Sequence, residues 1–366
     1  MQRRHFLAAA TALGSFAKAQ ENPPSNSKDE QPESASEKPP EKIGFQPKSA
    51  NGLGGVAIGN GLKPTTDVEA QGALQAAWDS GVRHFDTAPF YGFGLSERRF
   101  GQFLSGKDPE SYTLSTKVGR LLTPSMNPDP GLWTKVPHFK PVVDYSASAT
   151  RRSIEDSLQR LGVYSIDIAY IHDLSPDFFG DEWEEKFAEA EKGAIPELQK
   201  MKDEGLIKAW GFGVNTLPPL LKCLEVANPD VFLSACQYSL VHHEEALEKL
   251  FPKCEEKNVS LVNGAPLNFG FLSGRDRYNY GKTIPGNMLT RREKIQEVCR
   301  KHAVELRSAA LQFSAYPAVM CATIPGARNA SQARANVESM SAKIPADFWK
   351  ELKSEGLIAP NAPVPA

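Results

Sequence analysis

Residues 81–101 read GVRHFDTAPFYGFGLSERRFG and predict a strand, a loop and a helix in succession. The β-branched and aromatic run VRHFDTA at 82–88 is followed by turn residues and then by apolar positions at helical spacing from about residue 96. Asp86 lies near the end of the expected strand and Tyr91 in the loop that follows. The stretch is therefore typical of a β-α unit with polar side chains at its carboxyl end.

The pattern of this unit recurs along the rest of the chain. Strands are expected at 55–59, 82–88, 112–118, 166–172, 209–215, 231–239, 259–265 and 319–325. Helices are expected at 67–80, 96–105, 148–161, 184–204, 217–227, 244–257, 291–315 and 329–341. Eight strands in strict alternation with eight helices, the strands apolar on both faces, predict an α/β fold: a single-domain (β/α)8 TIM barrel with eight parallel strands.

The first 48 residues do not share this pattern. Residues 1–19 combine Arg3 and Arg4 with a short alanine-rich run and a small-residue cleavage site, which predicts a twin-arginine signal peptide and export to the periplasm. The alternatives are an ordinary secretory signal and, if the signal is not used, a cytoplasmic protein. Residues 20–48 are rich in Pro, Ser, Glu and Lys, which is typical of a disordered linker, so the barrel is expected over 49–366.

Charge and cysteine usage exclude several classes of partner. The 42 basic and 44 acidic residues give a net charge of -2, which indicates no nucleic-acid binding. The N-terminal apolar run is far shorter than the roughly 20 residues that span a bilayer, so no stable membrane span is expected. Five scattered cysteines form no C-x-x-C pair, which indicates neither a disulfide framework nor a thiolate zinc site. A small-molecule substrate is therefore favoured, and the oligomeric state stays open.

One glycine motif is misleading. Gly52-x-Gly54-x-x-Ala57 matches the dinucleotide pattern G-x-G-x-x-G/A, which binds phosphate only where it follows a strand and opens a helix. Here a polar segment precedes the motif and NGLKPTT follows it. We interpret it as a glycine-rich first strand at the rim of the barrel.

Four titratable side chains are expected to meet at one rim. Asp86 and Tyr91 belong to the second β-α unit, Lys117 ends the third strand in LSTKVG, and His172 ends the fourth in AYIHDL. Taken singly, each has a structural explanation as a helix cap, a solvated charge or a core residue. Because active sites of such barrels lie at the carboxyl ends of the strands, the four together indicate a catalytic site.

The chemistry that fits this set is hydride transfer. A carbonyl that accepts hydride needs a proton on its oxygen, and a phenol with an ordinary pKa of about 10 needs a nearby cation to stabilise its phenolate. Lys117 can supply that charge, Asp86 can keep the buried lysine cationic, and His172 can hydrogen-bond the substrate oxygen. Tyr91 would then act as general acid in reduction and as general base in oxidation.

Several separated stretches resemble the aldo-keto reductase family. They are GVRHFDTAPFYG with SERRFG, LSTKVGR, DSLQRLGVYSIDIAYIHD, GFGVN, ACQYSL and TIPGARNASQARANV, and they cover nearly all of the chain from about Asn51 onward. The resemblance implies a catalytic tetrad of Asp86, Tyr91, Lys117 and His172. It also implies NAD(P)-dependent hydride transfer on a small aldehyde, aldose or alcohol.

The same resemblance assigns a cofactor site. It implies that Asn215 and Gln237 bind the nicotinamide carboxamide, although either could instead cap a strand end. A loop over the pyrophosphate would comprise Ala265, Pro266, Leu267, Gly270 and Leu272. A segment at the adenosine would comprise Gly326, Ala327, Arg328, Gln332 and Asn336.

Two departures from the family pattern bear on the cofactor. Many members have a lysine at the position of Gly326 and an arginine at that of Gln332, both binding the 2′-phosphate of NADP, and neither residue is basic here. Arg328 offers a substitute phosphate fork, so NADP or NAD is expected, with NADP slightly favoured. VNGAPLN at 262–268 also lacks the aromatic side chain that commonly stacks on the nicotinamide.

Within the family, STKVGRLLTP, the DYS that precedes RRSIEDSLQRLG, and the tail WKELKSEGLIAPNAPVP resemble the D-threo-aldose 1-dehydrogenase and pyridoxal 4-dehydrogenase group. This implies oxidation of an aldose or hydroxy-aldehyde at C1, or of a pyridoxal-like aldehyde. The long loop over 119–145, with Trp133, His138 and Phe139, is expected to form much of the substrate pocket. The alternative is that the loop only covers the barrel.

Two other classes of protein stay open. A cofactor-binding regulator, of the type seen in potassium-channel β subunits, would keep the nicotinamide site without turnover. An unrelated barrel isomerase or hydrolase would need metal ligands or a carboxylate pair at the rim. The neighbouring residues His242 and His243 diverge too much to share a metal, so no metal is expected.

Overall fold

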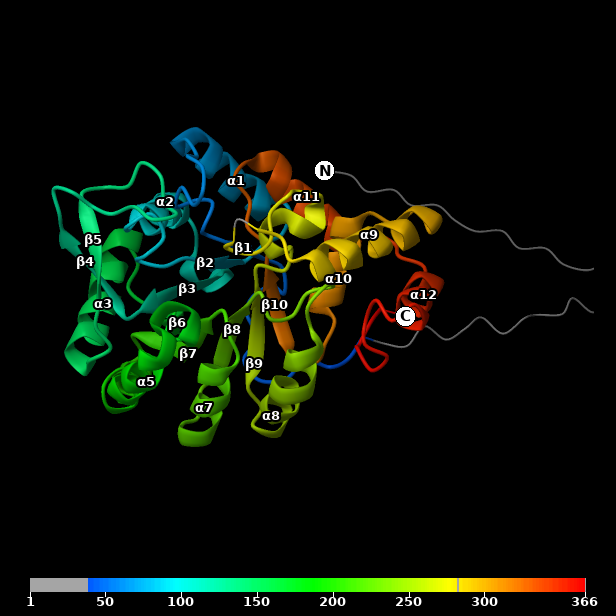
Figure 1. Ribbon diagram of the computed structural model, residues 1–366. Helices are drawn as coiled ribbons and strands as arrows, with labels where there is room; N and C mark the ends of the chain where they lie inside the picture. The colour runs from blue at the N-terminus through cyan, green and yellow to red at the C-terminus, as the bar shows by residue number, and fades with distance from the viewer. Residues whose placement is uncertain (1–38, 282, 366) are drawn as a thin grey trace, which may run out of the picture. The chain divides into compact units, whose positions relative to one another are not determined.

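A parallel eight-stranded barrel organises the chain in the computed structural model, which describes residues 39–281 and 283–365. The predicted signal peptide at 1–19 and the linker up to residue 38 lie outside the described residues. The strand order is β1-β2-β3-β6-β7-β8-β9-β10, and backbone hydrogen bonds from Thr323 to Ala50 and from Gly54 to Pro325 join the two ends of the sheet. The predicted barrel is therefore confirmed, and Figure 1 shows its helices outside the strands.

The barrel strands are short and completely buried along most of their length. They are β1 (Gly52–Gly54), β2 (His84–Asp86), β3 (Thr113–Val118), β6 (Ile166–His172), β7 (Ile207–Val214), β8 (Val231–Ala235), β9 (Ser260–Gly264) and β10 (Met320–Ile324).

The helices that surround them carry one apolar face toward the strands. They are α1 (Asp67–Asp79), α2 (Leu95–Leu104), α3 (Ala147–Leu161), α4 (Pro176–Phe179), α5 (Trp183–Lys192), α6 (Ala194–Asp203), α7 (Pro218–Val226), α8 (Phe251–Glu256), α9 (Gly286–Lys301), α10 (Leu306–Ala315), α11 (Ala330–Ser341) and α12 (Ala346–Ser354). Shorter 3-10 or π turns are η1 (Pro109–Ser111), η2 (Gly180–Glu182), η3 (Ala246–Leu250) and η4 (Asn268–Ser273).

The first strand lies earlier than the sequence predicts. Residues 55–59 form turns instead of a strand, and β1 is the preceding glycine-rich segment. The reason is a close backbone approach: a Cβ on Gly92 would lie 2.2 Å from the carbonyl oxygen of Gly59. The segment after β1 therefore turns over the rim and packs on the loop that carries Tyr91.

Two long predicted helices are each divided in two. The segment predicted at 184–204 breaks at Gly193, where a Cβ would lie 2.6 Å from the carbonyl oxygen of Tyr145. The segment predicted at 291–315 breaks between α9 and α10 at residues 302–305. The strict alternation of eight strands and eight helices is thus wrong in detail, and α12 is an addition to it.

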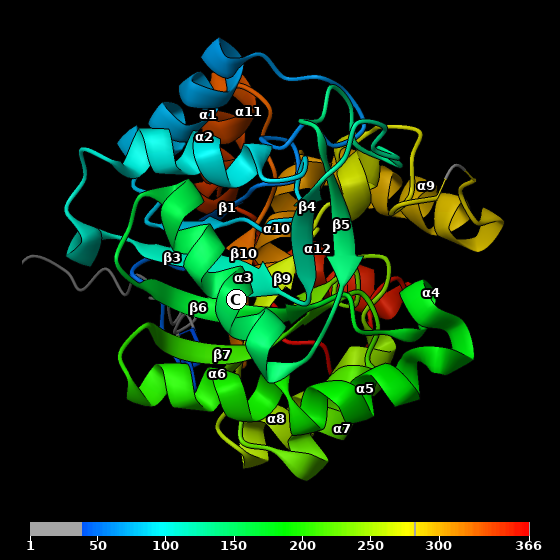
Figure 2. The same ribbon diagram turned by 90° about the vertical axis from the view of Figure 1, so that its left-hand side faces the viewer.

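The loop predicted over 119–145 contains an antiparallel hairpin of β4 (Arg120–Pro124) and β5 (Phe139–Val143). Figure 2, which shows the side that faces left in Figure 1, places this hairpin in front of the barrel strands. Its first residue, Arg120, pairs with Val143 and follows β3 by two positions. The hairpin therefore lies close to the carboxyl ends of β2 and β3.

Residues 42–48 close the opposite end of the barrel. The Lys42 ammonium donates to the carbonyl oxygens of Ala315, Tyr316 and Pro317 at 2.7, 3.0 and 2.8 Å. Ser260, the first residue of β9, donates to the carbonyl oxygen of Phe45. The linker predicted to extend to residue 48 is thus too long, because its last residues form a floor at the amino ends of the strands.

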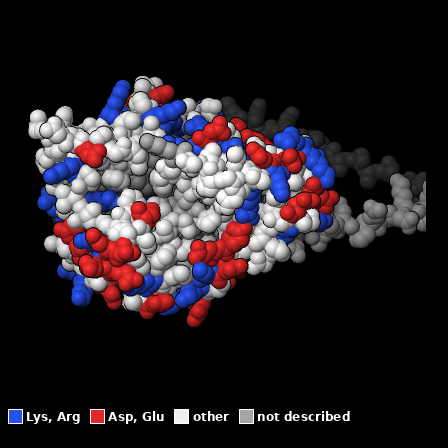
Figure 3. Space-filling model, viewed as in Figure 1, with Lys and Arg blue, Asp and Glu red and all other residues white. Residues whose placement is uncertain are grey.

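The surface carries mixed charge. Figure 3 shows basic and acidic side chains interspersed over one face, with no extended field of either sign. Within residues 39–281 and 283–365, no helix combines the length and the hydropathy that a membrane crossing needs.

Candidate active site

A buried ion pair forms the base of the site. The Lys117 ammonium lies 2.9 and 2.8 Å from the two carboxylate oxygens of Asp86, and it also donates to the carbonyl oxygen of Thr87 at 2.8 Å. The Ser115 hydroxyl donates to Asp86 at 2.7 Å. Burial lowers the pKa of Lys117 and raises that of Asp86, while each charge opposes the shift in its partner. Because both groups have close partners of complementary charge, the lysine is held in one position.

Strand register accounts for this meeting. Asp86 lies level with Ser115, and Lys117 lies level with Tyr170. Ser115 is the residue opposite Asp86, and Lys117 lies two residues nearer the rim than Ser115. Because side chains alternate along a strand, Lys117 and Ser115 are on the same face of β3. The long lysine side chain reaches back to the carboxylate.

Tyr91 lies above this pair because of the turn that follows β2. Gly92 has a φ of +63°, and the contact with Gly59 leaves no room for a side chain there. The Lys117 ammonium lies 4.7 Å from the centroid of the Tyr91 ring. Burial, with a further contribution from Asp86, raises the pKa of Tyr91 well above its ordinary value. The net shift is thus opposite to the lowering expected from Lys117, and Tyr91 is a protonated phenol in this conformation.

His172 completes the group at the end of β6. Its ring centroid lies 5.6 Å from that of Tyr91, with the two rings edge to face. The Tyr145 hydroxyl donates to the His172 carbonyl oxygen at 2.8 Å. Burial and the nearby cations Lys117 and Arg120 lower the pKa of His172 well below its ordinary value. The imidazole is therefore neutral, and its Nδ1 has no hydrogen-bond partner.

The structure thus brings the four predicted residues to one rim. A pocket next to them is lined by Phe90, Tyr91, Lys117, Trp133, His172, Asp173, Phe178, Asn215 and Tyr280, among others. The Trp133 ring lies 5.5 Å from the Tyr91 ring, measured between centroids. The other two residues predicted for this pocket lie elsewhere: His138 is exposed, and Phe139 packs against the small cluster around Leu122. Both belong to the outer part of the hairpin.

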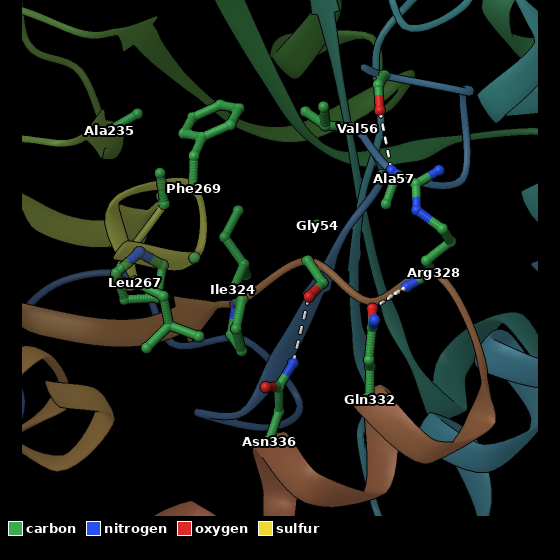
Figure 4. Close-up of a pocket in the computed structure, with 18 of the residues that line it drawn as sticks. Gly54, Val56, Ala57, Ala235, Leu267, Phe269, Ile324, Arg328, Gln332 and Asn336 are labelled. Atoms are coloured by element: carbon green, nitrogen blue, oxygen red, sulfur yellow. Dashed lines mark hydrogen bonds between the residues drawn. The ribbon is translucent and has the colours of Figure 1, made fainter. Parts of the chain in front are cut away.

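A longer cleft adjoins the pocket and ends near Tyr91. Figure 4 shows it between Gly54, Val56 and Ala57 on one side, Leu267 and Phe269 on another, and Arg328, Gln332 and Asn336 at the far end. Of the predicted cofactor residues it is lined by Ala265, Pro266, Leu267, Gly270, Gly326, Arg328, Gln332 and Asn336. Val56, Tyr91, Leu233, Ala235 and Tyr280 line both cavities. The two cavities therefore meet at the predicted general acid.

The walls of this cleft suit a dinucleotide. Gly54 lets the backbone of β1 approach β10, because a Cβ there would lie 2.9 Å from the carbonyl oxygen of Ile324. Three arginine side chains, Arg275, Arg307 and Arg328, line the cleft from different segments and suit the negative charge of phosphates. The residues present thus fit a nicotinamide dinucleotide, with its reactive end toward Tyr91.

Comparison with known proteins agrees with this geometry. The model of the Aldo/keto reductase family matches residues 52–355. The chain belongs to the aldo/keto reductase family. It is 35% identical over 328 residues to pyridoxal 4-dehydrogenase of Microbacterium luteolum, covering 85% of this chain and 95% of that protein. It is also 35% identical over 320 residues to D-threo-aldose 1-dehydrogenase of a Pseudomonas species, covering 84% and 94%.

Solved structures support the fold of this family member. An aldo-keto reductase from Bacillus halodurans in its holo form superposes with a TM-score of 0.65 at 23% identity, covering 86% of this chain and 94% of that one. Glycerol dehydrogenase from Gluconobacter oxydans gives a TM-score of 0.64, also at 23% identity, covering 89% and 97%. These two structures bear on the fold alone, whereas the family match and the two dehydrogenase relatives show that the protein is an oxidoreductase, of a family that uses small-molecule substrates and NAD(P)H.

Three residues that the resemblance assigns to the cofactor site are either hydrogen-bonded to other residues or buried away from the cleft. The Asn215 amide donates to Asp177 at 3.0 Å and accepts from the Tyr280 hydroxyl at 3.3 Å. Gln237 lies beyond the end of β8, not within it, and donates to the carbonyl oxygen of Asn215 at 2.5 Å. Leu272 is completely buried in the core and lines no part of the cleft.

Arg328 serves the loop after β1. Its guanidinium donates to the carbonyl oxygens of Gly61 and Lys63 and to the Thr65 hydroxyl, at 2.9, 2.6 and 2.5 Å. Its backbone N–H donates to the Gln332 side chain at 2.9 Å, as drawn in Figure 4. In this conformation Arg328 therefore holds residues 61–65 beside the cleft.

Several residues at the site were not predicted from the sequence. An aromatic pair, Phe269 and Tyr280, lines the cleft with ring centroids 4.3 Å apart. Arg120 and Asp173 lie beside His172. Asp173 directly follows an expected strand in AYIHD, and Arg120 follows another by two positions in STKVGR, and these positions were the available indication for them. Nothing local in the sequence indicates Tyr280.

Proposed function

We propose that this aldo/keto reductase is an NAD(P)-dependent dehydrogenase that oxidises an aldose or a related hydroxy-aldehyde at C1. The observation that carries the proposal is the meeting of the two cavities at Tyr91, above the Lys117–Asp86 pair and edge to face with His172. The relatives named for aldose and pyridoxal dehydrogenation support the substrate class.

The residues that would hold the cofactor lie along the longer cleft. Arg275 would interact with phosphate, Phe269 and Tyr280 would contact the ring of the nicotinamide, and Asn215 would bind its amide after exchanging its present partners. When bound, the nicotinamide supplies the acceptor or donor of the hydride. Arg328 does not decide between NAD and NADP as long as its donors hold residues 61–65.

Tyr91 moves the proton in this proposal. As a protonated phenol it can donate to a carbonyl oxygen in reduction without a prior ionisation. In oxidation the same oxygen must accept a proton, and the Lys117 ammonium near the ring is the cation that favours the phenolate. Neutral His172 can donate an N–H to the substrate oxygen and orient it. Trp133 and Phe90 exclude water from one side of the pocket.

A substrate panel tests the proposal. The full chain is assayed by nicotinamide absorbance against aldopentoses, aldohexoses and simple aldehydes, with NAD and NADP in separate series. We expect oxidation of aldoses at C1 to their lactones with at least one of the two oxidised cofactors and, as a separate reaction, reduction of simple aldehydes to alcohols by the reduced cofactor. Tight binding of a cofactor, measured by fluorescence, without turnover of any substrate would contradict the proposal and indicate a regulatory module.

A further inference from the structure

A second charged pair, Arg120 and Asp173, lies at the pocket, with Asp173 in its lining and Arg120 behind it, and has no role in proton transfer. Arg120 and Asp173 form an ion pair at 3.4 Å, and the same Asp173 oxygen lies 3.4 Å from Nε2 of His172. Arg120 begins β4 and Asp173 directly follows β6. The pair therefore touches the residue that would bind the reacting oxygen.

Both members are buried and incompletely bonded. Arg120 is 7% exposed and Asp173 6%. Nε and Nη2 of Arg120 make no hydrogen bond, although they are buried. These donors are closed off from solvent, and Arg120 does not line the pocket, so its guanidinium acts on the pocket through the ion pair with Asp173. Asp173 is the member of the pair that a ligand can reach.

Aromatic rings fix Arg120 on two sides. Its guanidinium carbon lies 4.6 Å from the centroid of Phe90 and 4.7 Å from that of Phe178, and both rings line the pocket. Stacking of this kind orients a planar guanidinium and keeps its edge available for hydrogen bonds. Arg120 is therefore held in the pocket wall behind Asp173.

The backbone turns Asp173 into the pocket. Its φ of +48° lies in the left-handed region, which costs free energy for any residue other than glycine, although Asp adopts it more readily than most. Its N–H donates to the carbonyl oxygen of Gly213 at 3.0 Å, which holds this conformation. The carboxylate lines the same pocket as Tyr91 and His172.

The charges of the pair limit what it can bind. A carboxylate or phosphate on the substrate would meet the negative charge of Asp173 before it gained Arg120. A neutral hydroxyl suits the pair, because it can donate to the Asp173 carboxylate without bringing a second negative charge to it. Oxygens on two neighbouring carbons are separated by about the length of a hydrogen bond, which is comparable to the separation of His172 and Asp173.

We propose that Asp173, held in place by Arg120, binds the hydroxyl on the carbon next to the reacting carbon, which makes the enzyme selective for 2-hydroxy aldehydes and aldoses over their 2-deoxy analogues. This inference rests on the proposed function and specifies its substrate class. Phe90 and Phe178 would contact the apolar face of the same substrate.

The ionisation of Asp173 agrees with this role. Burial raises its pKa to about 7, Arg120 and Lys117 oppose that rise, and Asp177 adds to it. The charged neighbours of Asp173 are thus Arg120 from β4, Lys117 from β3 and Asp177 from α4. Neutral His172 faces Asp173 from β6. Asp173 therefore loses its negative charge as the pH falls through about 7. Selectivity for the 2-hydroxyl is then expected to weaken below that pH.

The test compares substrates that differ by one hydroxyl. Wild-type kcat/KM is measured for reduction of glycolaldehyde and acetaldehyde, and for oxidation of an aldose and its 2-deoxy analogue. We expect the 2-hydroxy substrate to be favoured roughly tenfold to a hundredfold, as for a hydrogen bond to a charged group. Asp173→Asn should bring this ratio close to one and remove its pH dependence. Arg120→Met should do the same, and Arg120→Lys should give an intermediate ratio.

Controls separate the possible failures. Asp156→Asn, in a surface pair with Arg152 on α3, should keep the wild-type ratio, and thermal unfolding identifies a variant that is misfolded. Equal use of acetaldehyde and glycolaldehyde by the wild type, or equal losses for both in Asp173→Asn, would overturn the inference alone. A preference for glyoxylate over glycolaldehyde would overturn it by assigning the pair to an anion. No turnover of any aldehyde or aldose would overturn the proposed function and the inference with it.

Discussion

The pocket around Tyr91 and the cleft that adjoins it are built by different means. The pocket depends on charged and aromatic side chains at the ends of β2, β3 and β6, held by short contacts such as that between Lys117 and Asp86. The cleft depends largely on backbone and on loops after β1, β9 and β10. The pocket is therefore sensitive to single side chains, and the cleft to how its loops are held.

The largest expected effect is a loss of turnover caused by a substitution in the pocket. Tyr91→Phe removes the phenolic proton with little change in volume, so turnover should fall by roughly 10²- to 10⁴-fold, as for the loss of a general acid. Steady-state assays in both directions measure the loss, and fluorescence titration measures cofactor affinity. Affinity should change little. Near-normal turnover in this variant would show that another group transfers the proton.

Lys117→Met should have a smaller effect that depends on pH. The phenolate loses its nearest cation, so oxidation should slow roughly tenfold or more. The pH at which the oxidation rate rises should be higher than in the wild type. Reduction should stay less sensitive to pH, because Tyr91 is already protonated. Thermal unfolding should also show destabilisation, since Asp86 stays buried with the Ser115 hydrogen bond but without its cation. An unchanged pH profile for oxidation would exclude an electrostatic role for Lys117.

The smallest of the three effects tests the cleft. Arg328→Ala frees residues 61–65, so binding of NAD and NADP should weaken by similar factors of roughly three to tenfold, the size of one or two hydrogen bonds. Thr65→Val, which removes one acceptor and keeps the arginine, should weaken both cofactors less. Fluorescence titration with each cofactor measures this. A loss confined to NADP would instead assign Arg328 to the 2′-phosphate, as its place in the sequence suggests.

The difference between the pocket, which is built from side chains at strand ends, and the cleft, which is built from backbone and loops, explains which parts of the site the sequence could predict. Asp86, Lys117 and His172 end strands that are apolar and β-branched, so their positions follow from pattern alone. β1 has only Leu53 between two glycines, which is too weak a pattern to locate a strand, so the first strand was predicted at 55–59 instead. Arg120 was missed because the hairpin that it begins was not predicted. The partner strand of this hairpin, FKPVV, contains a proline and alternates between half-buried and exposed residues, unlike a barrel strand.

Contacts between distant segments were out of reach for a separate reason. Tyr280 meets Asn215 from 65 positions away, and Arg328 meets Gly61 from 267 positions away. No periodicity records such a pairing, because it depends on how two loops close over the barrel. The resemblance to the family located the adenosine segment, and it could not tell that the guanidinium of Arg328 holds the loop after β1.

The floor formed by residues 42–48 determines how this enzyme can be attached to a support. Lys42 fixes the first described segment to the end of α10, at the amino ends of the strands, whereas Tyr91 and His172 lie at their carboxyl ends. Immobilisation through residues ahead of Lys42 therefore leaves the substrate entrance turned toward the solution. Beads that carry the protein by its amino terminus should retain the KM of the free enzyme, while capture through the β4–β5 hairpin should obstruct access and raise it.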